Sequence, residues 1–230
     1  MRIVGLLLAA LLVGFASAVG SGRLAVPDRW NPWAPLSIAD EPNLLTGYKL
    51  GRLADDPPAC RAALGASGMR HAAQPDRRID GDCGWSDAVR ITATPTPVSQ
   101  PFVLECPAAV AFALWERHSV QPLARRLLGS PVARIDHFGS FACRNIGGEA
   151  GGRRSEHASA NALDVAGFVL ANGDTVRVAR DWSAEGPRGR FLRAIHAGAC
   201  GFWNVVLGPD YNAAHRDHLH LDRGGFRACR

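Results

Sequence analysis

The alternation of apolar and polar residues predicts a set of short strands from residue 88 onward. Strands are expected over residues 88–94, 132–138, 162–170, 174–179, 203–207 and 218–221. The Asn172-Gly173 pair is a strong signal for a hairpin turn between the third and the fourth of these strands. Strands joined by so short a turn run antiparallel, so the pattern favours an antiparallel sheet.

Helical spacing marks three longer stretches of the chain. Helices are expected over residues 107–118, 121–128 and 188–199. Pro107 suits the first turn of a helix, and Gly129 is typical of the residue that ends one. Antiparallel strands combined with separate helices predict a fold of the α+β class.

Residues 1–18 have the pattern of an export signal. A positively charged start is followed by an apolar core over residues 3–15, and Ala18 ends a small-x-small cleavage pattern. We therefore expect cleavage after Ala18 and a periplasmic or secreted protein. The alternative is an uncleaved anchor in the inner membrane, because the apolar run over residues 3–19 is nearly long enough to span a bilayer.

Residues 19–58 show no sustained periodicity and are rich in proline. They are expected to form a largely irregular leader. Trp30 and Trp33 either dock on the domain or remain exposed in this leader. The folded domain is expected over residues 59–230, which is long enough to enclose one hydrophobic core.

Positive charge is in excess but is dispersed along the chain. The formal net charge is +5, and Lys49 is the only lysine among the basic residues. This arginine bias reflects either genomic codon usage or attraction to an anionic surface such as a cell wall. The arginines form isolated pairs rather than a dense basic run, so nucleic-acid binding is not expected.

An even number of cysteines in an exported chain predicts disulfide bonds. The six residues are Cys60, Cys83, Cys106, Cys143, Cys200 and Cys229. Six cysteines permit many pairings, and we favour bonds between neighbours: Cys60 with Cys83, Cys106 with Cys143, and Cys200 with Cys229. The chain has no Cys-x-x-Cys pair, which argues against a zinc ribbon or a thioredoxin-like site.

Two short segments concentrate residues that can bind a metal ion. His157 and Asp164 lie seven residues apart, and His218 and His220 alternate on an expected strand, so both imidazoles point the same way. Two imidazoles and one carboxylate are a normal ligand set for Zn²⁺ with one position left for water, whereas Ca²⁺ prefers oxygen ligands. The other interpretation is a group of ordinary histidines and a structural aspartate.

A hydrolytic metal site also needs a proton acceptor close to the metal. Asp217 and His218 both lie near His220 in the sequence. On a regular strand they point to opposite faces, so only one of them can face the metal. We favour His218, because it shares the face of His220.

The pattern Ser155-x-His157-x₆-Asp164, followed by His218-x-His220, resembles the LAS metallopeptidases, which include D-Ala-D-Ala carboxypeptidases and peptidoglycan endopeptidases. The chain departs from their pattern at Ala160, where glycine is usual.

From about Cys60 to Cys229 the chain resembles more closely the bacterial extensin-like C-terminal family. The motifs that carry this resemblance are Cys143-Arg144-Asn145, Ser155-Glu156-His157-Ala158, Asn161-Ala162-x-Asp164, Leu207-Gly208-Pro209-Asp210 and His215-x-Asp217-His218-Leu219-His220.

The resemblance implies an LAS/hedgehog-like metallopeptidase core, with a small antiparallel sheet flanked by helices and stapled by disulfides. It implies that His157, Asp164 and His220 bind Zn²⁺. In the endopeptidase branch the residue that matches His218 is the base, whereas in the carboxypeptidase branch an acid at the place of Asp217 takes this role.

Three further residues receive expected roles through the same resemblance. Arg144 would polarise the substrate carbonyl or clamp a carboxylate, unless it merely pairs with a surface acid. Ser155 would support the site by hydrogen bonding. His215 would either hold a metal ligand in place or face the substrate.

The expected function is that of an exported zinc-dependent peptidase that hydrolyses peptide bonds of peptidoglycan stems or cross-links. The alternative is a non-catalytic module that binds the cell wall or has a structural role while retaining the metallopeptidase fold. A phosphoesterase is disfavoured, because the sequence offers no second cluster of metal ligands.

Overall fold

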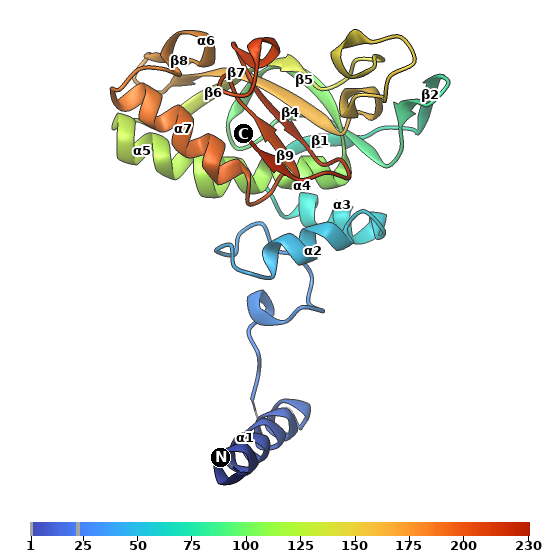
Figure 1. Cartoon of the computed structure of the whole chain (residues 1–230), viewed down its shortest axis with the longest axis vertical. Helices are drawn as coiled ribbons and strands as arrows, with labels where there is room; N and C mark the ends of the chain where they lie inside the picture. Colours follow the sequence, from blue (N-terminus) through green and yellow to red (C-terminus); the bar gives the residue numbers. More distant parts are fainter. Residues whose placement is uncertain (1, 22–23) are drawn as a thin grey trace.

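The computed structural model describes residues 2–21 and 24–230, and its centre is a nine-stranded mixed sheet (Figure 1). The strand order is β1-β4-β5-β6-β7-β10-β9-β11, and β8 pairs with β7. These strands are β1 (Arg70–Ala73), β4 (Ala88–Ala93), β5 (Pro97–Glu105), β6 (Val132–Gly139), β7 (Ala162–Leu170), β8 (Thr175–Arg177), β9 (Val205–Leu207), β10 (Leu219–Asp222) and β11 (Ala228–Cys229). A separate two-stranded sheet pairs β2 (Arg77–Asp80) with β3 (Cys83–Trp85).

The longer helices of the domain lie against one side of the sheet (Figure 1). The helices are α1 (Arg2–Gly20), α2 (Thr46–Arg52), α3 (Pro57–Gly65), α4 (Cys106–Trp115), α5 (Gln121–Leu128), α6 (Val178–Asp181) and α7 (Pro187–Ala199). Short helical turns are η1 (Asp28–Trp30), η2 (Glu116–Val120), η3 (Ile146–Gly148), η4 (Glu156–Ser159) and η5 (Ala213–His215). The α+β prediction is confirmed, although β5–β6 and β9–β11 pair in parallel.

Helix α4 is the centre of the hydrophobic core. Nine of its residues are buried, and the indole of Trp115 donates a hydrogen bond of 2.8 Å to the Ile195 carbonyl on α7. The helix ends three residues earlier than the sequence pattern predicts. It passes into the π-helical turn η2, where the Glu116 carboxylate accepts hydrogen bonds from the side chains of Thr96 and Gln121. Gly129 ends α5 in a left-handed conformation, as the sequence predicts.

One predicted boundary was wrong and one strand was missed, each for an identifiable reason. The chain leaves β8 after Arg177 and turns into α6, because the Asp181 carboxylate accepts a hydrogen bond from the Arg177 amide and caps the turn. Strand β5 was missed because Pro97 and Pro101 are poor strand residues. Proline is tolerated here because the β4–β5 pairing has a bulge opposite this segment.

The leader contains a helix that the sequence pattern did not predict. Helix α2 buries Leu50 fully, and Ile38 and Leu53 join the same hydrophobic core as α4. The Lys49 ammonium group is also buried and donates a hydrogen bond of 2.7 Å to the Asp28 carbonyl. The described core begins at Ile38, so it receives no side chain from α1. Within residues 2–21 and 24–230, no helix is long and apolar enough to cross a membrane.

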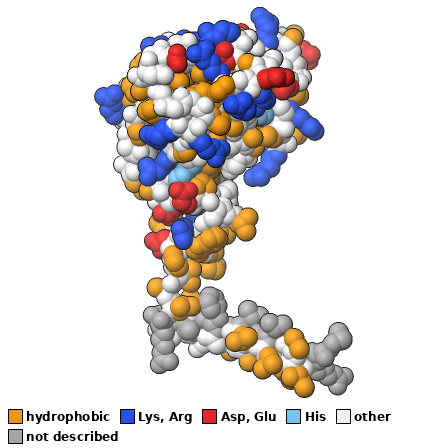
Figure 2. Space-filling view, turned by 90° about the vertical axis from the view of Figure 1, so that its left-hand side faces the viewer, with side chains coloured by type: hydrophobic (Ala, Val, Ile, Leu, Met, Phe, Trp, Pro, Cys, Tyr) orange, Lys and Arg blue, Asp and Glu red, His pale blue; other side chains and the backbone are white. Residues whose placement is uncertain are grey.

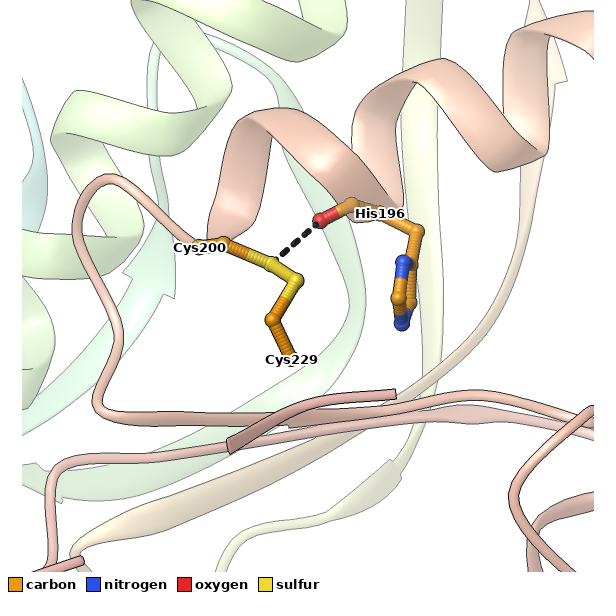
Figure 3. Close-up of side chains that lie close together, drawn as sticks. All are labelled: His196, Cys200 and Cys229. Carbon is orange, nitrogen blue, oxygen red and sulfur yellow. Dashed lines mark hydrogen bonds between the residues drawn. A yellow bond between two sulfur atoms is a disulfide. The ribbon is translucent and has the colours of Figure 1, made fainter. Parts of the chain in front are cut away.

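Two of the three predicted disulfide pairings were wrong. The bonds join Cys60 to Cys106, Cys83 to Cys143 and Cys200 to Cys229. The β4–β5 hairpin returns the chain so that the start of α4 lies against α3, which brings Cys106 to Cys60. Cys83 then pairs across to the loop that begins at residue 141. Only the C-terminal pairing of neighbours is confirmed; it ties β11 to the end of α7 (Figure 3).

Candidate metal centre

Three elements bring the predicted metal ligands together. His157 lies in η4, where Ser155 precedes the turn and its hydroxyl accepts a hydrogen bond from the His157 amide. Asp164 lies on β7 and His220 on β10. These two residues are directly opposite each other in the antiparallel ladder, so their side chains share one face of the sheet. The supporting hydrogen bond expected of Ser155 is therefore present.

The turn from η4 into β7 requires a left-handed residue. Ala160 has φ 55° and ψ 31°, and its amide closes the turn by bonding to the His157 carbonyl. This conformation is the one that glycine adopts most easily, which explains why glycine would be usual here. The turn therefore keeps its geometry with alanine in place of glycine, and Ala160 adopts a left-handed backbone conformation that is strained for a residue with a side chain.

The ligand atoms of the three residues lie in a tight triangle. His157 Nε2 is 3.1 Å from Asp164 Oδ1, His220 Nδ1 is 2.9 Å from the same oxygen, and the two nitrogens are 3.1 Å apart. Tetrahedral Zn²⁺ with bonds of about 2.0–2.1 Å keeps its ligand atoms roughly 3.3 Å apart. The triangle needs to expand by only a few tenths of an ångström, so these residues fit a zinc ion.

Each imidazole is fixed by a hydrogen bond from its second nitrogen. His157 Nδ1 lies 3.1 Å from the Ser140 carbonyl oxygen, and His220 Nε2 lies 3.0 Å from Asp222 Oδ2. Both partners are acceptors, so each ring donates there and keeps its other nitrogen, which faces Asp164, free for a metal. Sequence reasoning missed Asp222. Its position two residues after His220 on a strand was the available signal, because it places both side chains on one face.

The electrostatics of the triangle reflect two opposing causes. Burial alone raises the pKa of Asp164, but hydrogen bonds and charge from His157 and His220 outweigh it and hold the pKa well below its usual range. Burial lowers the pKa of His220, but its contacts with Asp164 and Asp222 outweigh that effect and raise the pKa to about 9. Without a metal ion the Asp164 carboxylate is therefore ionised and His220 carries a second proton on Nδ1, which a metal ion would replace.

His218 and Asp217 form a pair beside the triangle. His218 Nε2 is 3.5 Å from Asp164 Oδ1, and His218 Nδ1 is 2.9 Å from Asp217 Oδ1. Of the two residues it is His218 that lies next to Asp164, the one that we favoured, but the reason that we gave for this, the alternation of a regular strand, was wrong. Strand β10 begins only at Leu219, so the alternation of a strand does not apply to the two residues before it. His218 faces the triangle and Asp217 lies behind it.

His215 lies over the same site. Its ring centroid is 5.3 Å from that of His218 and 5.7 Å from that of His220, and its Nδ1 is 2.7 Å from Asn212 Oδ1. Burial, followed by the charges of His220 and His218, lowers the pKa of His215 to about 4. The His215 ring is therefore neutral at neutral pH, with Nε2 free to accept a hydrogen bond.

Two exposed aromatic rings extend this row of imidazoles. Phe138 packs edge-on against His218 at 5.8 Å, and Tyr211 packs edge-on against His215 at 5.6 Å. Phe138 is 59% exposed and Tyr211 is 50% exposed, so both rings offer free surface beside the metal centre. Sequence reasoning missed both residues, because an isolated aromatic residue next to a loop gives no signal of its own.

Arg144 lies in the glycine-rich loop that begins after β6. Its side chain is exposed and has no hydrogen bond or ion pair with any described residue. The surface acid that was considered as an alternative partner is therefore not found among them. The charge of Arg144 also helps to lower the pKa of His215, as the last of several causes, so Arg144 lies within electrostatic range of this ring.

A second cluster with metal-binding residue types consists of His196, Cys200 and Cys229 (Figure 3). Its two sulfur atoms are joined in a disulfide, whereas metals bind thiolates. His196 Nε2 instead lies 2.9 Å from the carbonyl oxygen of Arg230 and helps to hold the C-terminal strand. We assign this cluster a structural role.

Comparison with known proteins assigns most of the chain to one family. The family described as "Extensin-like protein C-terminus" matches residues 58–230, which is about three quarters of the chain. No curated protein and no solved structure matches the chain significantly. The matched region contains all three disulfides and every residue of the candidate metal centre. The chain therefore belongs to the extensin-like C-terminal family.

Proposed function

We propose that the chain is a zinc-dependent peptidase of the LAS type that hydrolyses peptide bonds in peptidoglycan stems or cross-links. One observation carries the proposal: His157 Nε2, Asp164 Oδ1 and His220 Nδ1 lie within 3.1 Å of one another, with His218 Nε2 beside them. A structural zinc site normally has four protein ligands, whereas three ligands with a neighbouring base are typical of catalysis.

The protein groups divide the work of hydrolysis between them. A bound zinc ion supplies Lewis-acid chemistry, which polarises a carbonyl group and makes water acidic near neutral pH. Asp217 accepts a hydrogen bond from the Nδ1–H group of His218, which leaves the Nε2 lone pair directed at the site. His218 then takes a proton from the attacking water and delivers it to the leaving nitrogen, so that protons balance over the reaction.

The surroundings of the centre suit an anionic, extended substrate. Arg144 offers an unpaired guanidinium group, which binds a carboxylate or a polarised carbonyl oxygen through two parallel hydrogen bonds. Phe138 and Tyr211 flank the imidazoles and offer flat apolar surface to the substrate on either side of the scissile bond. Peptidoglycan stems carry free carboxylates and are linked to sugar rings, which matches both features.

The location that we propose is the periplasm or the cell exterior. An apolar N-terminal helix, α1, covers the expected export signal, and the domain has three disulfides and no free cysteine in its described part. Disulfides persist in oxidising compartments, which include the bacterial periplasm.

The test is a digest of purified murein by the zinc-loaded protein, followed by mass spectrometry of the released fragments. Hydrolysis releases one new amino terminus per cut, and the fragment masses distinguish a carboxypeptidase from an endopeptidase. The His218→Ala variant should bind zinc but lose activity by roughly 10²–10⁴-fold, the usual contribution of general acid–base catalysis. A zinc-bound protein that binds murein without new amino termini would instead support the non-catalytic wall-binding module.

A further inference from the structure

Exposed apolar side chains gather on the leader. Leu44 is 94% exposed and Trp33 is 79% exposed, while Tyr48 and Trp30 are 52% and 47% exposed. Figure 2 shows apolar side chains along the narrow neck that lies below the domain. We call these four residues the leader patch. A cluster of large apolar groups in water is unusual on a soluble surface and indicates an interaction site.

Hydrogen bonds hold the leader patch together as one surface. Asn43 Nδ2 donates to the Arg29 carbonyl at 2.8 Å, which joins the segment before Leu44 to the segment before Trp30. Arg52 Nη1 donates to the Pro32 carbonyl at 3.1 Å, which ties the residue before Trp33 to the end of α2. The four apolar side chains therefore belong to two segments that are fixed to each other.

The opposite side of this segment is anchored in the domain. Ile38, Leu50 and Leu53 are each at most 5% exposed and belong to the same core as α4. The leader therefore packs on the domain through these buried side chains, and the leader patch is its solvent-exposed side.

The composition of the patch matches the interface of a lipid bilayer. Tryptophan and tyrosine are enriched there, because an aromatic ring with a polar group suits the boundary between headgroups and acyl chains. The guanidinium carbons of Arg29 and Arg52 each lie 6.0 Å from a neighbouring ring, that of Trp30 and that of Tyr48. Long basic side chains at this depth can extend to the headgroups.

Net charge does not drive this contact. Residues 19–58 contain four basic residues and five acidic ones, so the leader has a formal charge of 4 − 5 = −1. Attraction to anionic lipids would require the opposite sign. The affinity for the bilayer must therefore come from insertion of the apolar rings, and binding of this kind depends little on salt concentration.

The position of the leader in the chain also favours a membrane. Helix α1 ends at Gly20, four residues before Leu24, and four extended residues span roughly 14 Å at most. Six apolar side chains of α1 between Ile3 and Val13 are 60–74% exposed, so the segment that precedes the leader in the sequence also offers apolar surface. Figure 1 shows the leader below the domain, on the side away from the loop over residues 140–161.

We propose that the leader patch inserts into the interfacial layer of a lipid bilayer and holds the domain with its metal centre facing away from that membrane. The contact does not depend on the proposed hydrolytic activity. It remains after cleavage at Ala18, because every residue of the patch lies beyond that point.

The test is vesicle flotation of residues 19–230, a chain that retains the whole described core. With phosphatidylcholine vesicles, the Trp30→Ala/Trp33→Ala variant should partition at least about tenfold more weakly than the unsubstituted chain at low and high salt, since it removes two large inserted rings. The matched control is Ile146→Ala/Phe226→Ala, which removes two side chains of 48% and 63% exposure from the domain. The control should float like the unsubstituted chain.

Three results would overturn the proposal. They are an unsubstituted chain that does not float, equal flotation of the tryptophan variant, and loss of flotation in high salt. Sedimentation velocity of the same samples tests the alternative that a second copy of the chain covers the patch. In that case the unsubstituted chain would be a dimer and the tryptophan variant a monomer, while flotation would be the same for both. Thermal unfolding of each variant should match the parent, because all four substituted side chains are exposed.

Discussion

Replacing Asp222 by asparagine should weaken zinc binding without unfolding the domain. The Asp222 carboxylate is 6% exposed and accepts two hydrogen bonds, one from His220 Nε2 at 3.0 Å and one from the Gly224 amide at 2.8 Å. Asparagine has the same shape but only one oxygen, so one of the two donors loses its acceptor. Where the lost bond is that of His220, its ring is no longer held with Nδ1 free for the metal.

The expected magnitude follows from the role of such partners. Loss of a group that orients a metal-binding imidazole costs about 10–100-fold in affinity, which corresponds to roughly 1.4–2.8 kcal/mol. The assay is competition for zinc between the protein and a coloured chelator. Asp210→Asn is the matched control, because Asp210 accepts a hydrogen bond of 2.9 Å from Trp182 and contacts no ligand of the triangle. An Asp222→Asn protein with the zinc affinity of its parent would refute the reasoning.

Three further predictions follow from the same geometry. Because the pKa of His220 is raised to about 9 in the site without metal, zinc binding at pH 7.5 should release close to one proton, and zinc affinity should fall as the pH drops below 9. Calorimetry in buffers of different ionisation enthalpy measures the proton release. Equal heats of binding in all buffers would contradict the prediction. Ala160→Val should lower the free energy of unfolding by about 2 kcal/mol or more, because a β-branched residue is placed at φ 55°, whereas Ala160→Gly should change it by less than about 1 kcal/mol; urea unfolding measures both. Phe138→Ala/Tyr211→Ala should raise KM for murein fragments while zinc content stays unchanged, and an unaltered KM would remove these rings from the substrate-binding surface.

The sequence was most informative where a local pattern determines the geometry. The strand over residues 162–170 and the spacing of His157 and Asp164 are local, and the structure has both in the expected place. The pairing of Asp164 with His220 joins residues 56 positions apart, and two signals indicated it: the alternation of histidines near residue 220 and the family resemblance.

Features that depend on the path of the chain in three dimensions were not predictable. The disulfide between Cys60 and Cys106 depends on a hairpin that contains two prolines, which a strand prediction passes over. Helix α2 has too short an apolar pattern to be recognised, and it forms because Leu50 packs against α4. The contact of His218 with Asp217 arises because β10 starts one residue after His218, and strand boundaries are uncertain by more than that.

The most direct test of the metal centre is the zinc stoichiometry of the purified protein, measured by mass spectrometry of the metal after dialysis against trace zinc. The parent protein should bind one zinc ion per chain, and His157→Ala, Asp164→Ala and His220→Ala should each bind none, while His218→Ala should still bind one. A parent protein that keeps no zinc, or a His220→Ala variant that retains a full equivalent, would contradict the account.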